Sequence, residues 1–383
     1  MKAALLVQPR QIEVRDLPDP QPGPRDVLIR NDAVGVCGSD IHIFQGHMNW
    51  NLDEGQQPIP LQQEPQVLGH EIAGTVVEIG SAVDDLSVGD RVIVDQGLNC
   101  SSQDRSPFCE YCASGFSHHC EHYREHGITG LPGGFANLIA VPAVNAVRID
   151  GDLSMSEAAM TEPLGCVLHS LDLMMQLGAR YRINAPEEIN RARSILVCGG
   201  GPAGQLFIQA MRSVLGFEGR MLISDPDPGK RKMAEACGAQ TIDPHGDESV
   251  PEFVARETSG RLCEIVVDAC GVPTMWQEFA RCIRKQGTGI LYGFGRERGA
   301  GGTLDELQWR GASLVATSGA SGPLDPDGRP AVYRRALQYL EDGVVDTSQL
   351  FTHRYEEWSL LNQALGSDPE TPGYLKGVFL VPR

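Results

Sequence analysis

The chain has 383 residues, 41% of them hydrophobic and 21% charged, and is long enough for two domains with full cores. Its formal net charge of −18 argues against nucleic-acid and anionic-membrane partners, because both need clustered lysine and arginine side chains. No apolar run approaches the roughly 20 residues of a membrane span, and the apolar core of the N-terminus is too short for a signal peptide.

The first hundred residues combine predicted strands with motifs rich in metal-binding side chains. Residues 1–35 alternate apolar and polar positions between proline-rich turns, which predicts an antiparallel β region. The motif GVCGSDIH follows at residues 35–42. A polar segment, residues 46–66, then leads into LGHEIAGTVVEIG at residues 68–80, and VGDRVIV at residues 88–94 reads as a turn and a strand. Cysteine, histidine and glutamate, the side chains that bind zinc, thus come from separated segments.

A second concentration of cysteines follows within residues 100–120. Its members are Cys100, Cys109, Cys112 and Cys120. With no signal peptide, eleven cysteines suggest a cytoplasmic, reducing location, where clustered thiols bind metal more often than they pair. Four thiolates would close a tetrahedral site without an open position, so the role would be structural. Free thiols and a disulfide are the alternatives.

Residues 194–225 contain the parts of a dinucleotide-binding unit in order. An apolar strand at residues 195–198 precedes the glycine spacing G-x-G-x-x-G, a helical run at residues 205–215 and a second apolar strand at residues 221–223. The glycine spacing alone is weak evidence, but the full order predicts nucleotide binding. A methyltransferase that binds S-adenosylmethionine is the rival with similar local features.

Each glycine of this turn has a physical role. Gly199 permits the tight turn, Gly201 lets the backbone approach a pyrophosphate, and Gly204 lets helix and strand pack closely. The helix N-terminus offers free N–H groups to that pyrophosphate. The residues that we expect at the cofactor are Gly199, Gly201, Pro202, Ala203, Gly204, Asp225 and Arg231.

The end of the second strand indicates which dinucleotide binds. Asp225 can accept hydrogen bonds from both ribose hydroxyls and would repel a 2′-phosphate, which favours NAD over NADP. Lys230 and Arg231 lie nearby in the sequence and keep NADP open as the alternative.

Strand and helix signals alternate after Asp225. Residues 263–268, 289–292 and 313–316 read as strands, with a helical stretch at residues 274–286 between the first two. This predicts an α/β fold with a doubly wound parallel sheet of about six strands. Cys270-Gly271 and Gly293–Gly295 would end strands on the cofactor side, although both also read as plain turns.

Taken together, these motifs resemble the zinc-dependent medium-chain dehydrogenases, and within them the polyol (sorbitol), threonine and glucose dehydrogenase branch. The resemblance covers nearly the whole chain, with the motifs in the family's order. It implies a GroES-like β catalytic domain in residues 1–165, a Rossmann NAD-binding domain in residues 166–320, and completion of the catalytic domain by residues 321–383.

The resemblance also implies a catalytic zinc. Cys37 and His70 match the family's ligands, and Glu162 in the TEPL segment stands where classical alcohol dehydrogenases have a second cysteine. Glu71 follows the ligand histidine and would be either a ligand or a group that orients the ligands. The same choice applies to Glu162.

Zinc would lower the pKa of the substrate hydroxyl, and hydride would pass to the nicotinamide. The resemblance gives Ser39 and His42 the proton relay, with the nicotinamide ribose between them. Ordinary loop hydrogen bonds are the alternative for both side chains.

The cysteine cluster departs from the family at one point. Cys109, Cys112 and Cys120 match the last three members of the structural zinc lobe, but eight residues instead of two separate Cys100 from Cys109. A loop can absorb this length. His118 or His119 could otherwise replace Cys100.

The resemblance implies an enzyme that oxidises a secondary alcohol of a polyol, sugar or related polar compound to a ketone or lactone with NAD. L-threonine oxidation and simple alcohol or aldehyde oxidation are alternatives within the family, and relatives are often dimers or tetramers. A zinc-free quinone reductase or a non-catalytic nucleotide binder are the other classes considered. Residues 46–66 could line the substrate cleft, decorate the surface or form an oligomer contact; their polar and aromatic side chains include His47, Asn49, Trp50 and Asp53.

Overall fold

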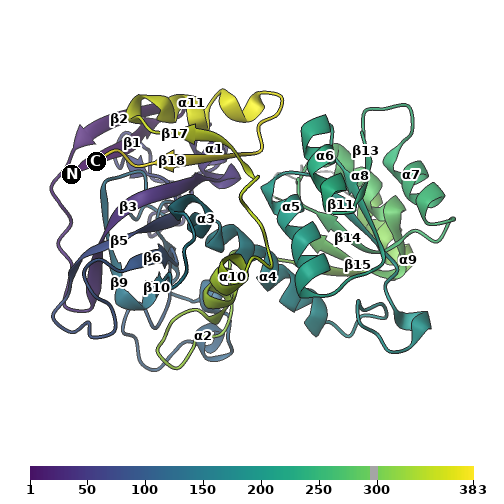
Figure 1. The fold of residues 1–383 in the computed structure, drawn as a ribbon, viewed down its shortest axis with the longest axis horizontal. Helices are drawn as coiled ribbons and strands as arrows, with labels where there is room; N and C mark the ends of the chain where they lie inside the picture. The colour runs from purple at the N-terminus through teal and green to yellow at the C-terminus, as the bar shows by residue number, and fades with distance from the viewer. Residues whose placement is uncertain (294–300) are drawn as a thin grey trace. The chain divides into compact units, whose positions relative to one another are not determined.

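The computed structural model describes residues 1–293 and 301–383. Contacts divide the chain into two compact units, Met1–Gly165 with Ala320–Arg383, and Cys166–Gly319 (Figure 1). Both termini lie in the first unit.

The first unit is built mainly from antiparallel β structure. Its sheets have the strand orders β2-β1-β4, β10-β6-β5-β3-β18-β17 with β9 also paired to β3, and β7-β8. The strands are β1 (Lys2–Gln8), β2 (Gln11–Asp16), β3 (Asp26–Val36), β4 (Gln66–Val67), β5 (Glu71–Ile79), β6 (Arg91–Val94), β7 (Gly97–Leu98), β8 (Arg124–Glu125), β9 (Leu138–Pro142), β10 (Ala146–Arg148), β17 (Phe351–Tyr355) and β18 (Lys376–Leu380).

Strand β3 organises this unit because it pairs with three other strands. It is antiparallel to β5, β9 and β18, and the last pairing joins the end of the chain to its beginning. Apolar side chains of these strands, among them Ile29, Val34, Ile72, Ile139 and Phe379, are buried in one core. Burial of this apolar surface holds the N-terminal and C-terminal segments together as one domain.

Short helices connect the strands of the first unit. They are α1 (Gly38–Phe44), α2 (Glu110–Ala113), α3 (Met155–Ala159), α10 (Ala331–Glu341) and α11 (Leu361–Leu365), with 3-10 turns at η1 (Ser117–His119), η2 (Ala143–Asn145), η5 (Trp358–Leu360) and η6 (Asp368–Glu370). Helix α4 (Thr161–Gln176) begins in the first unit and continues into the second.

The second unit is a parallel sheet with helices on both faces (Figure 1). Its strand order, β13-β12-β11-β14-β15-β16, is that of a Rossmann fold. The predicted α/β class and six-stranded parallel sheet are therefore confirmed. The strands are β11 (Ser194–Cys198), β12 (Arg220–Ser224), β13 (Gln240–Ile242), β14 (Cys263–Asp268), β15 (Ile283–Leu291) and β16 (Ser313–Ala316).

The helices of this unit differ from the predicted ones at two places. The helix predicted over residues 274–286 ends four residues early, because Ile283 is buried and pairs with Cys263 as the first residue of β15. Tertiary pairing here overrides the helical pattern. The helix expected from residue 205 begins earlier and closes in a π-helical turn. The helices are α5 (Pro202–Gln209), η4 (Ala210–Val214), α6 (Pro228–Ala236), α7 (Val250–Glu257), α8 (Pro273–Cys282) and α9 (Gly301–Arg310), with a 3-10 turn at η3 (Glu188–Asn190).

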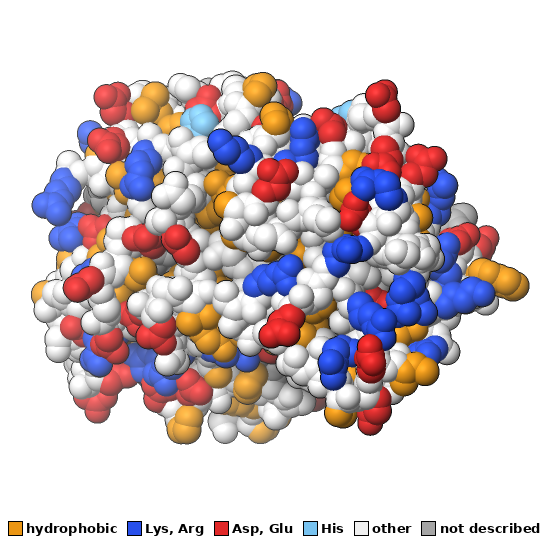
Figure 2. All heavy atoms as spheres, turned by 45° about the vertical axis from the view of Figure 1, so that its right-hand side comes forward, with side chains coloured by type: hydrophobic (Ala, Val, Ile, Leu, Met, Phe, Trp, Pro, Cys, Tyr) orange, Lys and Arg blue, Asp and Glu red, His pale blue; other side chains and the backbone are white. Residues whose placement is uncertain are grey.

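The described helices include none that combines the length and the apolar character needed to cross a bilayer. Acidic and basic side chains are interspersed on the face drawn in Figure 2, so the excess of 50 acidic over 32 basic residues does not gather there into one acidic patch. Of the predicted strand end at residues 293–295, Phe294 and Gly295 lie outside the described residues.

Candidate metal and dinucleotide sites

Strand β3 ends at the first predicted metal ligand. Cys37 directly follows β3 and is the residue before helix α1. The buried carboxylate of Asp40 accepts a hydrogen bond from the backbone N–H of Cys37 through Oδ2 and from that of Gly69 through Oδ1, both at 3.0 Å. One aspartate therefore fixes the two chain segments that carry Cys37 and His70.

Three of the four residues predicted for the catalytic zinc lie together. Cys37, His70 and Glu71 each offer a ligand atom, and these atoms lie within 4.8 Å of one another. His70 and Glu71 are buried. Nδ1 of His70 faces Asp40, and the carboxylate of Glu71 faces Lys376. A sulfur, an imidazole and a carboxylate are the kinds of side-chain ligand that zinc takes, so the donor set fits a zinc ion.

The surroundings of His70 favour positive charge. Burial alone lowers the pKa of His70, but the charges of Asp40 and Cys37 and their hydrogen bonds outweigh it, so the pKa lies well above its ordinary value. Nδ1 of His70 lies 3.4 Å from Oδ1 of Asp40. The negative charge of Asp40 and Cys37 that favours a proton on His70 also favours a metal cation at the same place.

Glu71 also forms an ion pair that the sequence did not predict. Nζ of Lys376, the first residue of β18, lies 2.6 Å from its carboxylate, and both side chains are buried. The pKa of Lys376 is raised, because its attraction to Glu71 and to Cys37 outweighs the burial that lowers it. The carboxylate is thus held by an ammonium group as well as lying beside Cys37 and His70.

Glu162 does not belong to the same group of ligand atoms. It is buried in the first turn of α4, and its Oε1 accepts a hydrogen bond from Nε2 of Gln96 at 3.1 Å. The structure therefore gives Glu162 a fixed partner and leaves it outside the group formed by Cys37, His70 and Glu71.

The two predicted relay residues both lie on α1. The hydroxyl of Ser39 donates to Sγ of Cys37 at 3.2 Å, which places it beside the metal-binding group. Burial and the neighbouring His47 lower the pKa of His42, so its imidazole is neutral at neutral pH and can accept a proton. The ring centroids of His42 and His47 are 5.9 Å apart.

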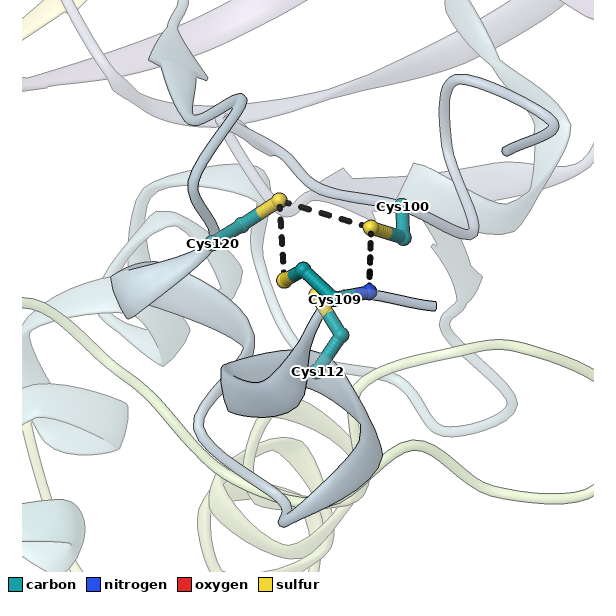
Figure 3. A group of neighbouring side chains, drawn as sticks. All are labelled: Cys100, Cys109, Cys112 and Cys120. Carbon is teal, nitrogen blue, oxygen red and sulfur yellow. Dashed lines mark hydrogen bonds between the residues drawn. The ribbon is translucent and has the colours of Figure 1, made fainter. Parts of the chain in front are cut away.

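The four cysteines of residues 100–120 form a second group (Figure 3). Their sulfur atoms lie within 4.8 Å of one another, with Cys120 at 3.7 Å from Cys100 and 3.9 Å from Cys109. A disulfide has a bond of about 2.05 Å, so none of these contacts is one. A tetrahedron with metal–sulfur distances of about 2.3 Å has edges of about 3.8 Å. The sulfur spacing thus fits a closed zinc site.

Backbone hydrogen bonds support thiolates at this group. The N–H of Cys109 donates to Sγ of Cys100 and the N–H of His122 donates to Sγ of Cys120, both at 3.4 Å. Hydrogen bonds from the backbone, first of all that of Cys112, lower the pKa of Cys109 to about 6. Burial raises the pKa of Cys112 and of Cys120, so of these three thiols Cys109 is the one that ionises readily before a metal binds.

The long gap after Cys100 does not remove that cysteine from the group. The loop between Cys100 and Cys109 returns the chain to α2, and its turn includes a hydrogen bond from Arg105 N–H to the carbonyl of Cys100. The predicted substitute His118 instead directs Nε2 to Oδ1 of Asp95 at 3.1 Å. Neither His118 nor His119 is part of the sulfur group.

The glycine turn has the geometry that the sequence predicted for a dinucleotide loop. Gly199 has φ +100°, a conformation that side chains rarely adopt. A Cβ on Gly204 would lie 1.9 Å from the carbonyl oxygen of Gly199. Gly201 precedes α5, and Pro202 and Ala203 begin it, so the turn leads into a helix N-terminus, where backbone N–H groups commonly bind an anion.

Asp225 is directed back to this turn. It is buried at the end of β12, and Oδ2 accepts a hydrogen bond from Gly200 N–H at 2.7 Å. Arg231 is already engaged, because it donates to the carbonyls of Asp225 and Pro226 and lies 3.2 Å from Asp243. Lys230 and Arg231 are the two basic residues near Asp225 in the sequence. The side chain of Arg231 is bound by other groups of this protein.

The segment of residues 46–66 uses several of its polar groups internally. Asn49 donates to the carbonyl of Ile59 and accepts from Asn51 N–H, and Asp53 accepts from Gln57 N–H. These bonds fix the shape of the segment itself, so they do not identify it as part of a substrate site.

Comparison with known proteins gives a consistent result. Residues 23–151 match the family described as Alcohol dehydrogenase GroES-like domain. L-threonine 3-dehydrogenase of Thermococcus kodakarensis is 30% identical over 78% of this chain and 77% of its own. Sorbitol dehydrogenase of Bacillus subtilis is 27% identical over 93% and 90%.

A solved structure extends the likeness to the whole fold. A Sinorhizobium meliloti 1021 protein, named as a zinc-binding dehydrogenase and bound to NADP, is 28% identical and has a TM-score of 0.78, with 99% of this chain and 98% of the other covered. Full-length similarity of fold, together with a 30% identical relative over most of the chain, shows that this protein belongs to the zinc-dependent medium-chain dehydrogenase family.

Proposed function

We propose that this protein is a zinc- and NAD-dependent dehydrogenase that oxidises a secondary alcohol of a polyol, sugar or related polar substrate. The observation that carries the proposal is the group of half-buried Cys37 with buried His70 and Glu71, in a chain that also has a dinucleotide turn. The family membership supports an oxidoreductase, and the sorbitol dehydrogenase relative supports a polyol substrate.

Zinc, when bound, supplies a Lewis acid that lowers the pKa of a substrate hydroxyl, and NAD supplies the hydride acceptor. The chain's own residues hold these groups and move the proton. Cys37 and His70 are the proposed ligands, with Glu71 and Glu162 as carboxylates that bind the metal or orient its ligands. The cysteine group would bind a second, structural zinc.

The proposed proton path begins at Ser39. Its hydroxyl lies beside Sγ of Cys37 and can pass a proton away from the reacting oxygen. His42, on the same helix, has a lowered pKa and accepts the proton at a ring nitrogen when it is neutral. With the nicotinamide ribose as the link between them, Ser39 and His42 would supply the base chemistry that alcohol oxidation needs.

Metal analysis of the purified protein tests the proposal. We expect about two zinc ions per chain, one for each ligand group. NADH absorbance with a panel of polyols, sugars, L-threonine and simple alcohols then identifies the substrate. Active protein that contains no zinc would reject the mechanism, and zinc-free hydride transfer of the quinone reductase type would then be the better interpretation.

L-threonine is the second candidate substrate. It is favoured by the threonine dehydrogenase relative, which is 30% identical to this chain. Activity with threonine and none with polyols in the same panel would select it.

Exchange of the buried carboxylate at the end of β12 tests the choice of cofactor. We expect Asp225→Asn to shift the ratio of the kcat/KM values for NADP and NAD about tenfold or more toward NADP. The reason is that the carboxylate no longer repels the 2′-phosphate of NADP. A tenfold shift corresponds to roughly 1.4 kcal/mol. The amide oxygen can still accept the hydrogen bond from Gly200 N–H, whereas the bond that Oδ1 accepts from Asp227 N–H is lost.

Asp227→Asn is the matched control, because it makes the same chemical change at a residue that caps α6 instead. It should leave the cofactor ratio within about twofold. A wild-type enzyme that already prefers NADP would overturn the assignment to NAD.

A further inference from the structure

A buried glutamine contacts Glu162 and is not part of either ligand group. Gln96 has no exposed surface and lies between β6 and β7. Its Nε2 donates to Oε1 of Glu162 at 3.1 Å and to Oε1 of Glu125 at 3.0 Å. The hydroxyl of Tyr333, on α10, donates to Oε1 of Gln96 at 2.5 Å. Three polar contacts therefore meet at one side chain.

The chemistry of these contacts leaves only one orientation for the amide. Ionised carboxylates can only accept hydrogen bonds, so the NH₂ group of Gln96 must face Glu125 and Glu162. Both of its hydrogens are then used, and the carbonyl oxygen is left to accept from Tyr333. A flip of the amide would lose both bonds to the carboxylates and place its carbonyl oxygen against them.

The backbone around Gln96 is held as firmly as its side chain. The carbonyl of Gln96 accepts from His126 N–H at 2.9 Å. The preceding residue, Asp95, is buried, donates its N–H to Asn145 O at 2.8 Å, and has Oδ1 at 3.1 Å from His118 Nε2. His118 lies two residues before Cys120, so its contact with Asp95 links the segment of Gln96 to the part of the chain that carries the cysteine group.

We propose that Gln96 is a positioning residue that fixes the carboxylate of Glu162 for the catalytic zinc. The inference rests on the proposed function, because it takes Glu162 as a carboxylate of that site. A glutamate side chain has several rotatable bonds, and metal binding costs less conformational entropy when its direction is already fixed. Gln96 does this by holding Oε1 of Glu162.

Competition with a zinc-binding dye on the full-length protein tests the role without measuring turnover. The closed cysteine group should hold its zinc tightly, and the other zinc should exchange first. We expect Gln96→Leu to weaken the affinity for the exchangeable zinc by about 10- to 100-fold, as is typical for groups that orient metal ligands. The tightly held zinc should remain.

Glu125→Gln is the matched control. Glu125 is the other carboxylate that binds the amide of Gln96, and Glu125 is not proposed as a metal ligand. This variant should leave the affinity for the exchangeable zinc within about twofold of the wild-type value. If Gln96→Leu does not fold, Tyr333→Phe is measured in its place. It removes one hydrogen bond to Gln96, worth about 1 kcal/mol, and should weaken this zinc about fivefold.

Glu162→Gln separates this inference from the proposed function. If Glu162→Gln leaves the exchangeable zinc affinity unchanged, Glu162 is not a metal carboxylate and the proposed ligand set fails. If Glu162→Gln weakens it but Gln96→Leu or Tyr333→Phe does not, the positioning role is overturned. If Glu162→Gln and Gln96→Leu each weaken the affinity for the exchangeable zinc, the double variant should bind this zinc no more weakly than Glu162→Gln alone. The reason is that both substitutions act on the contact between Gln96 and Glu162.

Discussion

Replacement of His70 by alanine is expected to remove one zinc ion per chain and to lower kcat/KM by at least about 10³-fold, or about 4 kcal/mol of transition-state stabilisation. His70 is buried and offers one of the three ligand atoms that lie together among the described residues. Without it, the proposed set loses its imidazole nitrogen and keeps only Cys37 and the carboxylates of Glu71 and Glu162, which should not hold zinc well enough for Lewis-acid chemistry. Zinc content by atomic absorption and initial rates of NADH formation measure the two effects.

His126→Ala is the control for loss of any buried imidazole. His126 is also buried, and its Nδ1 contacts the carbonyl of Pro132 at 2.8 Å, not a ligand group. This variant should keep both zinc ions and most of its specific activity. A His70→Ala protein that retains full zinc content would contradict the assignment of His70 as a ligand.

The parts of the molecule that can be predicted from sequence are those in which short spacing decides the geometry. The glycine turn and α5 follow one another in the chain, so the glycine spacing together with the flanking strand and helix predicts the roles of Gly199 and Gly204. The Rossmann strands are recognisable because buried parallel strands form continuous apolar runs. The cysteine group is likewise predicted by its spacing. The long gap between Cys100 and Cys109 leaves open, from the sequence alone, whether Cys100 is the fourth ligand.

The contacts that tune the candidate metal site could not be predicted in this way. Lys376 is 305 residues from Glu71, and Tyr333 is 237 residues from Gln96, so no local pattern links these pairs. A weak signal existed for Lys376, since it is a charged residue at the start of an apolar run and such a residue needs a buried partner. Asp40 could have been found, because an acid three residues after Cys37 is the spacing of a helix cap.

The boundary between α8 and β15 shows a different limit. The sequence pattern carries a helix to residue 286, but Ile283 gains more by burial and by pairing with β14 than by another helical turn. Local preference is decided there by the neighbouring strand. The strands predicted in residues 1–35 do form and pair antiparallel, but β1 and β3 bury runs of consecutive residues instead of alternate ones.

Lys376→Met is the substitution that we expect to affect stability most. Lys376 and Glu71 are both buried, with Nζ 2.6 Å from the carboxylate, so removal of the ammonium group leaves a buried negative charge without its partner. Loss of one member of a buried ion pair typically costs about 3–5 kcal/mol of unfolding free energy. Urea unfolding of wild type and variant, matched for zinc content, measures this difference.

The double variant Glu71→Gln/Lys376→Met separates charge from packing. It replaces the carboxylate by a neutral amide of similar size, so most of the lost stability should return if the unpaired charge is the cause. If the double variant is as unstable as the single one, the side-chain packing of Lys376 accounts for the loss instead. Because Glu71 also lies beside Cys37 and His70, the pair with Lys376 gives this carboxylate a partner whether or not it binds the metal.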